Sequence, residues 1–286
     1  MSYADDTQFI VTGKTIEIVQ EKLENIVKIA VNWYKSNSLM SNPSKTEVII
    51  FTPSARNQST NIPTISVLEN GQTLLIEASS DVKILGVQID CNLTWNEHIK
   101  KLRNKTIGIV RHLHRVNKLL PMKSKLQLYD SLVASHFSYA DVIWSGCSKG
   151  NKQKLQRVQN FALKSILGMK KYDSASEARK NLKYLDLEEK RHIHEAVFTH
   201  KVLSGKMPKN ITEQYQILKP TTNTRSAQAG TLNIPKHKTE KYKSSLLYRS
   251  TKAWNETTET MRLHETSKFK RELQTRAISN KYQRTT

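Results

Sequence analysis

The hydrophobic period of the chain changes near Trp95, and this change is the strongest constraint on how the chain can fold. Before Trp95, short runs rich in β-branched residues lie between polar turns, which is typical of strands. After it, apolar residues recur at steps of three and four, which is typical of amphipathic helices. The sequence therefore predicts an α+β first third followed by a mostly helical remainder.

The charge of the chain divides at nearly the same place. Residues 1–100 hold 8 Lys/Arg and 11 Asp/Glu, a net charge of −3, whereas residues 101–286 hold 38 and 14, a net charge of +24. Lysine-rich helices are often only soluble surfaces, but so large an excess favours a polyanionic partner. Nucleic acid is favoured over a membrane surface, because no strongly apolar face accompanies the charge.

The sequence also argues against several classes of protein. It has no apolar run near the ~20 residues of a membrane-spanning helix, and its first residues lack the pattern of a signal peptide. Cys91 and Cys147 are too few for a disulfide framework or a cysteine-rich zinc site. We therefore expect an intracellular protein, in the nucleus or the cytoplasm and not secreted. The oligomeric state stays open.

Five strands are predicted in the first third, and we expect them to form one small sheet. They cover residues 9–12, 47–51, 64–68, 73–77 and 82–89. Asn70-Gly71 lies between two of them and is a strong hairpin signal. Gly86 indicates a point of close backbone approach within the last strand. An amphipathic helix is predicted over 15–36, with Leu23 and Trp33 on its core-facing stripe.

The remainder is predicted to form basic helices. We expect them from 95 to 120, from Pro121 onward, and over 149–167, 187–203, 248–254 and 267–278. Their cations would bind the phosphate backbone without reading bases. The predicted nucleic-acid contacts are Lys100, Lys101, Arg103, Lys105, Arg111, Arg115, Lys118, Lys152, Lys154, Arg157 and Lys164.

Tyr3-Ala4-Asp5-Asp6 is the first candidate for chemistry. The two carboxylates are predicted to lie on the turn that enters the strand over 9–12. Mg²⁺ prefers oxygen ligands such as these, and two such ions can clamp the attacking and leaving oxygens of a phosphoryl transfer. The alternative is a solvated pair of turn residues, which most Asp-Asp dipeptides are.

Several motifs, in order, carry a resemblance to one family. Tyr3-Ala4-Asp5-Asp6 is similar to the Tyr-x-Asp-Asp hairpin of reverse transcriptases, and the motif over 42–47 is similar to an Asn-Pro-x-Lys-Thr-Glu motif of non-LTR retroelements. Leu85-Gly86-Val87, followed by Leu93 to Ile99, resembles the signature after the palm of the same polymerases. The aromatic stretch over 137–144, which ends in a Trp, and Trp254-Asn255 resemble later motifs. Thr257-Thr258 departs from the Leu-Pro that usually follows Trp-Asn in the family.

The resemblance implies a domain plan and site residues. It implies a partial reverse transcriptase palm over 1–92 with a primer-supporting sheet, a thumb-like basic helical domain over 93–205, and a basic, partly disordered region over 206–286. Asp5 and Asp6 would bind Mg²⁺ in a two-ion site, and Lys45 would assist the pyrophosphate leaving group. RNA template and DNA primer or target DNA would be the partners. A solvated turn lysine is the alternative for Lys45.

Two hypotheses of function follow, and whether this chain is itself an enzyme stays open. The first is the C-terminal portion of a non-LTR retrotransposon RNA-directed DNA polymerase. Only Met1 and Ser2 precede the motif, so we expect its first strand and a further upstream Asp of the family to be absent, and the two-ion site to be incomplete. The second is a non-catalytic nucleic-acid-binding remnant. We expect His98 to be a helix-start or packing residue instead of a metal ligand, and the aromatic stretch to be core instead of a base-stacking surface.

Overall fold

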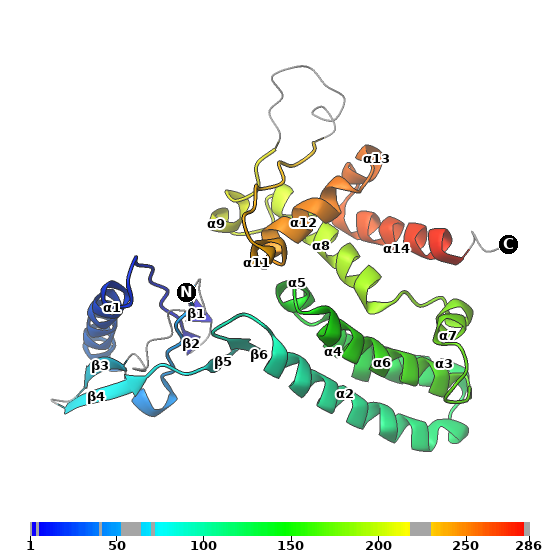
Figure 1. Cartoon of the computed structure of the whole chain (residues 1–286), viewed down its shortest axis with the longest axis horizontal. Coiled ribbons are helices and arrows are strands. Elements are labelled where there is room, and N and C mark those ends of the chain that lie inside the picture. Colours follow the sequence, from blue (N-terminus) through cyan, green and yellow to red (C-terminus); the bar gives the residue numbers. More distant parts are fainter. Residues whose placement is uncertain are drawn as a thin grey trace. The chain divides into compact units, whose positions relative to one another are not determined.

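The computed structural model describes residues 2–3, 6–39, 42–52, 64–69, 72–217 and 230–282. The chain divides into two compact units, Met1–Glu97 and His98–Thr286, and each is considered by itself. Figure 1 places the described strands in the first unit and all the helices after α2 in the second. In the described part of the chain, no helix is long and apolar enough to cross a membrane.

The first unit packs one long helix against a hairpin. Helix α1 (Ile16–Ser36) begins at Thr15, whose side chain caps the first turn. It lies against β3 (Thr64–Glu69), which pairs with β4 (Gln72–Glu77) in antiparallel register. The Glu24 carboxylate accepts hydrogen bonds from the backbone N–H and the hydroxyl of Ser66, at 2.9 and 2.8 Å. These bonds hold the helix in register on the hairpin.

The predicted stripe of α1 is only partly right. The small core of this unit contains Val31, Val48 and Ile65, with Leu23 and Val27 packed against it. Trp33, which was expected to face the core, has 57% of its surface exposed. Leu23, Val27 and Val31 follow one another at steps of four, so the stripe that packs on the sheet is displaced from the predicted one.

The predicted single sheet is wrong, because the described strands form three separate two-stranded sheets. The segment 9–12 is not a strand, and over 47–51 the structure has only an isolated bridge between Val48 and Ala78. The strands predicted over 64–68 and 73–77 are confirmed as β3 and β4. The hairpin signal Asn70-Gly71 lies outside the described residues.

The strand predicted over 82–89 is instead a hairpin of β5 (Asp81–Ile84) and β6 (Val87–Asp90). Ile84 pairs with Val87, so Leu85 and Gly86 form a two-residue turn. Both have positive φ, 45° and 85°, which is the conformation of a type I′ turn. Gly86 therefore serves to reverse the chain, and the lack of a polar residue between Ile84 and Val87 explains why the turn was not predicted.

The regular elements described in the second unit are helices, apart from an isolated bridge between Ile217 and Leu232, and the longest of these helices were predicted. The helices are α2 (Asn96–Val116, which begins in the first unit), α3 (Met122–Tyr129), α4 (Ser135–Ser138), α5 (Asp141–Trp144), α6 (Lys149–Ile166), α7 (Ala175–Leu182), α8 (Leu187–Leu203), α9 (Lys209–Thr212), α11 (Glu240–Lys243), α12 (Leu246–Asn255), α13 (Glu259–Arg262) and α14 (Thr266–Tyr282). A π-helical segment, Asp130–Ala134, joins α3 to α4. Helix α8 begins at Asp186, which forms a capping box with Glu189.

The last third of the chain packs on α8. Trp254, Met261 and Phe269 are buried with Ile193 and Val197 of α8. Figure 1 shows α12 and α14 lying against this helix. The described part of the region predicted over 206–286 therefore shares a core with the helices before it. Residues 218–229, where a loosely ordered connection was predicted, lie outside the described residues.

Candidate nucleic-acid interface

The Tyr-Ala-Asp-Asp motif is part of a short hairpin. Strands β1 (Ser2–Tyr3) and β2 (Asp6–Thr7) are antiparallel, with Tyr3 opposite Asp6. The expectation that the motif lacks its first strand is therefore wrong, because Ser2 and Tyr3 supply it. The strand that follows is Asp6–Thr7, not 9–12. Asp6 is exposed to solvent, and Asp5 lies outside the described residues.

The described residues around this motif do not fit a magnesium site. Mg²⁺ needs several oxygen ligands in near-octahedral geometry. Asp6 offers one exposed carboxylate, and the part of the chain that the structure describes contains no group of three or more His, Cys, Asp or Glu able to hold a metal ion.

Lys45 ends a short 3₁₀ turn, Pro43–Lys45, that is organised by Asn42. The Asn42 side chain accepts from the Ser44 hydroxyl at 2.6 Å, and its carbonyl oxygen accepts from the Lys45 N–H at 3.0 Å and the Thr46 hydroxyl at 3.1 Å. The Lys45 side chain is exposed. The polar residues of this motif thus build a turn that presents the lysine to solvent.

The turn between β6 and α2 is held by Asp90. Its carboxylate accepts from the backbone N–H groups of Thr94 and Trp95, at 2.9 and 2.7 Å. His98, in the first turns of α2, is buried, with its ring 5.4 Å from that of Trp144. Burial lowers the pKa of His98, with a further contribution from Lys101. His98 is thus confirmed as a packing residue near a helix start.

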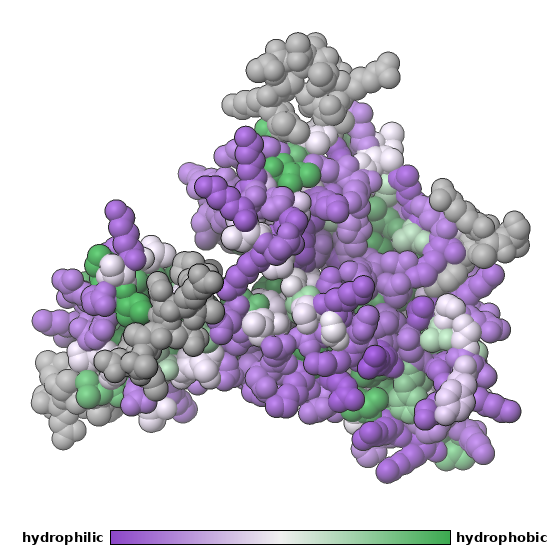
Figure 2. Space-filling view, in the orientation of Figure 1, coloured by the Kyte–Doolittle hydropathy of each residue, from purple (hydrophilic) through white to green (hydrophobic). Residues whose placement is uncertain are grey.

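The predicted contacts on α2 lie on its solvent-facing side. Lys100, Lys101, Arg103, Lys105, Arg111, Arg115 and the following Lys118 are all exposed. The helix has one acidic residue, Glu97, in its first turn. Figure 2 shows hydrophilic residues over most of the visible face around α2. A helix of 21 residues spans about 31 Å at 1.5 Å per residue, so its cations can meet several successive phosphates.

The predicted contacts on α6 are mostly engaged within the protein. Lys152 forms an ion pair with Glu188 at 2.9 Å, and Lys154 donates to the Asn151 side chain at 2.9 Å. Lys164 donates to the carbonyl oxygens of Lys171 and Asp173, at 2.6 and 3.3 Å. Arg157 is exposed. The structure therefore favours α2 over α6 as the main cationic face.

The ends of α2 and α6 are joined side by side. His114 Nδ1 lies 2.7 Å from Ser165 Oγ, and Asn117 donates to the Ser165 carbonyl oxygen at 2.6 Å. The His114 ring also packs on Phe161, with 5.6 Å between ring centroids. Figure 1 shows the two helices running alongside each other in this unit. The cations at the end of α2 are therefore held on a fixed scaffold.

The aromatic stretch over 137–144 is mainly core, as expected. Phe137 and Trp144 are buried, and the Trp144 indole donates to the Tyr139 carbonyl oxygen at 3.0 Å. The Arg191 guanidinium lies over the Trp144 ring, 4.8 Å from its centroid. Ser138, Tyr139 and Ile143 of this stretch are exposed.

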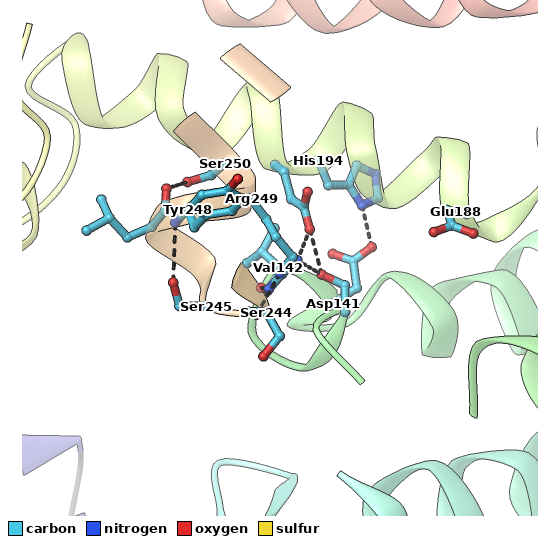
Figure 3. A network of polar contacts seen from close by, with 12 residues as sticks. Asp141, Val142, Glu188, His194, Ser244, Ser245, Tyr248, Arg249 and Ser250 are labelled. Atoms are coloured by element: carbon cyan, nitrogen blue, oxygen red, sulfur yellow. Dashed lines mark hydrogen bonds and ion pairs between the residues drawn. The ribbon is translucent and has the colours of Figure 1, made fainter. Parts of the chain in front are cut away.

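A buried polar network beneath this stretch was not predicted (Figure 3). Arg249 of α12 contacts Glu195 of α8 and the Ser145 hydroxyl. It also donates to the carbonyl oxygens of Val142 and Ser244, at 2.9 and 2.8 Å. His194 Nδ1 lies 2.6 Å from the Asp141 carboxylate. No sequence signal links Ser145 to Arg249, because their meeting depends on how three distant segments pack.

The Trp254-Asn255 motif also has a structural explanation. The Trp254 indole donates to the Gly230 carbonyl oxygen at 3.0 Å. The Asn255 amide accepts from the Leu232 N–H and donates to the Leu232 carbonyl, both at 2.9 Å. The side chain thus satisfies both backbone groups of a buried residue, in the way that a neighbouring strand would.

Comparison with known proteins adds relatives but no structural neighbour. No protein-family model matches the chain. No solved structure matches it either.

Its curated relatives include retrotransposon polymerases of flies. The chain is 22% identical over 204 residues to a probable RNA-directed DNA polymerase from transposon BS of Drosophila melanogaster, covering 70% of this chain and 22% of that protein. It is 25% identical over 193 residues to the RNA-directed DNA polymerase from mobile element jockey of the same species, covering 66% and 20%. A jockey polymerase of Drosophila funebris is 24% identical over 211 residues, covering 70% and 22%.

The chain thus spans about a fifth of the length of the curated relatives it matches. The matched part covers about two thirds of this chain or more in each case. These relatives make the chain similar to part of the jockey-like non-LTR retrotransposon RNA-directed DNA polymerases.

Proposed function

We propose that this chain is a nucleic-acid-gripping part of a retrotransposon RNA-directed DNA polymerase. The first unit would correspond to palm-derived structure within an α+β fold, and the helices from α2 onward to the thumb and the region after it. RNA template and DNA primer or target DNA would be the partners. The relatives' names support this, since they describe RNA-directed DNA synthesis.

The observation that carries the proposal is the cationic face of α2. Arg111, Arg115 and Lys118 are exposed and follow one another at steps of four and three, on or just beyond one helix. Such spacing places side chains on one side of a helix. Guanidinium and ammonium groups bind phosphate oxygens without selecting a sequence. The expected activity is therefore sequence-tolerant binding of RNA or DNA.

Catalysis is proposed only for a larger assembly. Asp5 and Asp6 would supply two of the ligands to Mg²⁺, with Lys45 near the leaving group. Further carboxylates would have to come from outside the described residues, because these include no metal-binding group. The second candidate function, a binding module without catalysis, needs only the exposed cations of α2. The two are separated by whether Mg²⁺-dependent synthesis can be detected.

Binding should be tested by titrating labelled duplex with the whole chain at 50 and 200 mM salt. Each phosphate contact on a duplex contributes about 0.9 to the slope of log affinity against log salt. Changing Arg111, Arg115 and Lys118 together to Gln should reduce the magnitude of that slope by about 2 to 3. The matched control changes Lys14, Lys28 and Lys35, exposed lysines in and before α1, to Gln.

The control variant loses the same charge and should keep the wild-type slope. Equal losses in both variants would mean that binding follows net charge alone, which would contradict a grip by α2. Absence of binding by the wild-type chain at low salt would overturn the proposed function.

A further inference from the structure

The loop between α6 and α7 is held in place by hydrogen bonds to α6 and within itself. Lys164 reaches from α6 to the carbonyl oxygens of Lys171 and Asp173, at 2.6 and 3.3 Å. The Asp173 carboxylate accepts from the Lys170 N–H at 2.5 Å, and the Asp173 N–H donates to the Lys170 carbonyl oxygen at 3.2 Å. Gly168, with φ of 69°, turns the chain away from α6. Residues 170–173 therefore form a closed turn anchored to a helix.

This turn holds an aromatic ring in solvent. Tyr172 has 90% of its surface exposed, against 55% for Tyr139 and 37% for Tyr242. The Lys171 ammonium lies over the ring, 5.3 Å from its centroid. Lys170 and Lys171 are both exposed. The turn therefore places the Tyr172 ring and the Lys170 and Lys171 ammonium groups together in solvent, on a backbone held by hydrogen bonds.

The end of α6 that leads into this turn is bonded to the cationic end of α2. Ser165, three residues before Gly168, is bonded to His114 and Asn117. Lys118 and Leu119 follow Asn117 in the chain, and Leu119 has 83% of its surface exposed. The Tyr172 turn is thus connected to the cationic end of α2 through Ser165 of α6.

We propose that Tyr172 is a stacking site for an unpaired base of single-stranded RNA or DNA, with Lys170 and Lys171 binding the adjacent phosphates. Exposed aromatic rings beside cations are the means by which single strands are bound without sequence preference. A duplex would use the cations alone, because its bases already stack on one another. This inference rests on the proposed nucleic-acid binding and adds that the ligand at Tyr172 is single-stranded.

The test measures binding of the whole chain to a labelled oligothymidylate, to the same strand with abasic sites, and to a duplex of equal length. Tyr172→Ala should weaken binding of the intact single strand about 5- to 100-fold. It should change binding of the abasic strand and the duplex less than about twofold, because neither offers an unstacked base. Tyr172→Phe keeps the ring and should bind like the wild type.

Tyr242→Ala is the matched control, since it removes another exposed tyrosine, on α11. It should leave all three affinities unchanged. Unchanged binding of the intact strand by Tyr172→Ala would overturn the stacking site, as would an equal loss on the abasic strand. Those results leave the proposed function intact, whereas a wild-type chain that binds none of the three ligands would overturn both.

Discussion

Arg249 of α12 and Glu195 of α8 form an ion pair whose side chains keep only 14% and 8% of their surface in solvent (Figure 3). The same guanidinium bonds the carbonyl oxygens of Val142 and Ser244. It therefore ties three segments together: the end of the aromatic stretch, α8 and α12. Because its donors are satisfied at these partners, removal of either charge leaves the other buried and unpaired.

Arg249→Met should lower the free energy of unfolding by about 3–5 kcal/mol, the cost of breaking a buried pair. Glu195→Leu should cost a similar amount, and the double variant should cost less than the two single changes added together. Chemical denaturation followed by circular dichroism measures all three. Strict additivity would contradict a direct coupling between the two side chains.

Arg191 offers a matched comparison, since its side chain is also buried on α8. Its three guanidinium nitrogens have no hydrogen-bond partner among the described residues, and its main contact is the Trp144 ring. Burial lowers the pKa of Arg191, with opposing contributions from Cys147 and Asp141. An unsatisfied buried charge costs stability. Arg191→Met should therefore lower the free energy of unfolding by less than about 1 kcal/mol, or raise it, whereas Arg249→Met should lower it by about 3–5 kcal/mol.

The buried network also marks the limit of what could be predicted from the sequence. Helices such as α8 were predicted because their apolar spacing is local information. The β5–β6 hairpin was missed because Ile84 to Val87, which contains its turn, has no polar residue to indicate one. The α1 stripe was misplaced, since Trp33 is apolar yet exposed. The cations were predicted as a class, but only packing decides that Lys164 serves its own loop while Arg111 faces solvent.

Leu85 provides a test of the hairpin turn. Its φ of 45° lies in the left-handed region, which costs an L-residue roughly 1–2 kcal/mol and which Asn tolerates better. Leu85→Asn should therefore raise the free energy of unfolding of the first unit by about 1 kcal/mol. Leu263→Asn, at an exposed leucine of the second unit whose φ is −77°, should change the free energy of unfolding of that unit by less than about 0.5 kcal/mol. Destabilisation by Leu85→Asn would contradict a turn with this backbone.

The junction between α14 and α8 should depend on pH. Lys281 contacts the carboxylates of Asp186 and Glu189, at 2.7 and 2.6 Å. Burial opposes the charge on Asp186, but the bonds from Lys281 and the Glu189 backbone outweigh it and lower the pKa of Asp186. Burial likewise opposes the charge on Lys281, and its two carboxylate partners outweigh it and raise the pKa of Lys281.

These directions fix the sign of the pH dependence. The contribution of Asp186 is present above its unfolded pKa and is lost as the pH falls through its lower folded pKa. That of Lys281 is present below its unfolded pKa and is lost as the pH rises through its higher folded pKa. Lys281→Met should therefore cost about 1 kcal/mol at pH 7 and much less at pH 3. A cost that is equal at the two pH values would mean that Lys281 acts through packing alone.

Primer extension on an RNA template with Mg²⁺ tests what the Asp5-Asp6 motif can do on this chain. We expect no synthesis above background, and the same result for the variant with Asp5→Ala and Asp6→Ala. The reason is the number of ligands: two ions must be held about 3.5–4 Å apart to clamp the reacting oxygens, and Asp6 brings one exposed carboxylate to a region where the described residues form no metal-binding group. Misplacing reacting groups by about 1 Å can already cost about 100-fold. Both proteins should still bind template equally, since the α2 cations are intact in each. Robust synthesis that the double substitution abolishes would show that the chain is a complete catalyst and that its metal ligands include residues beyond those described.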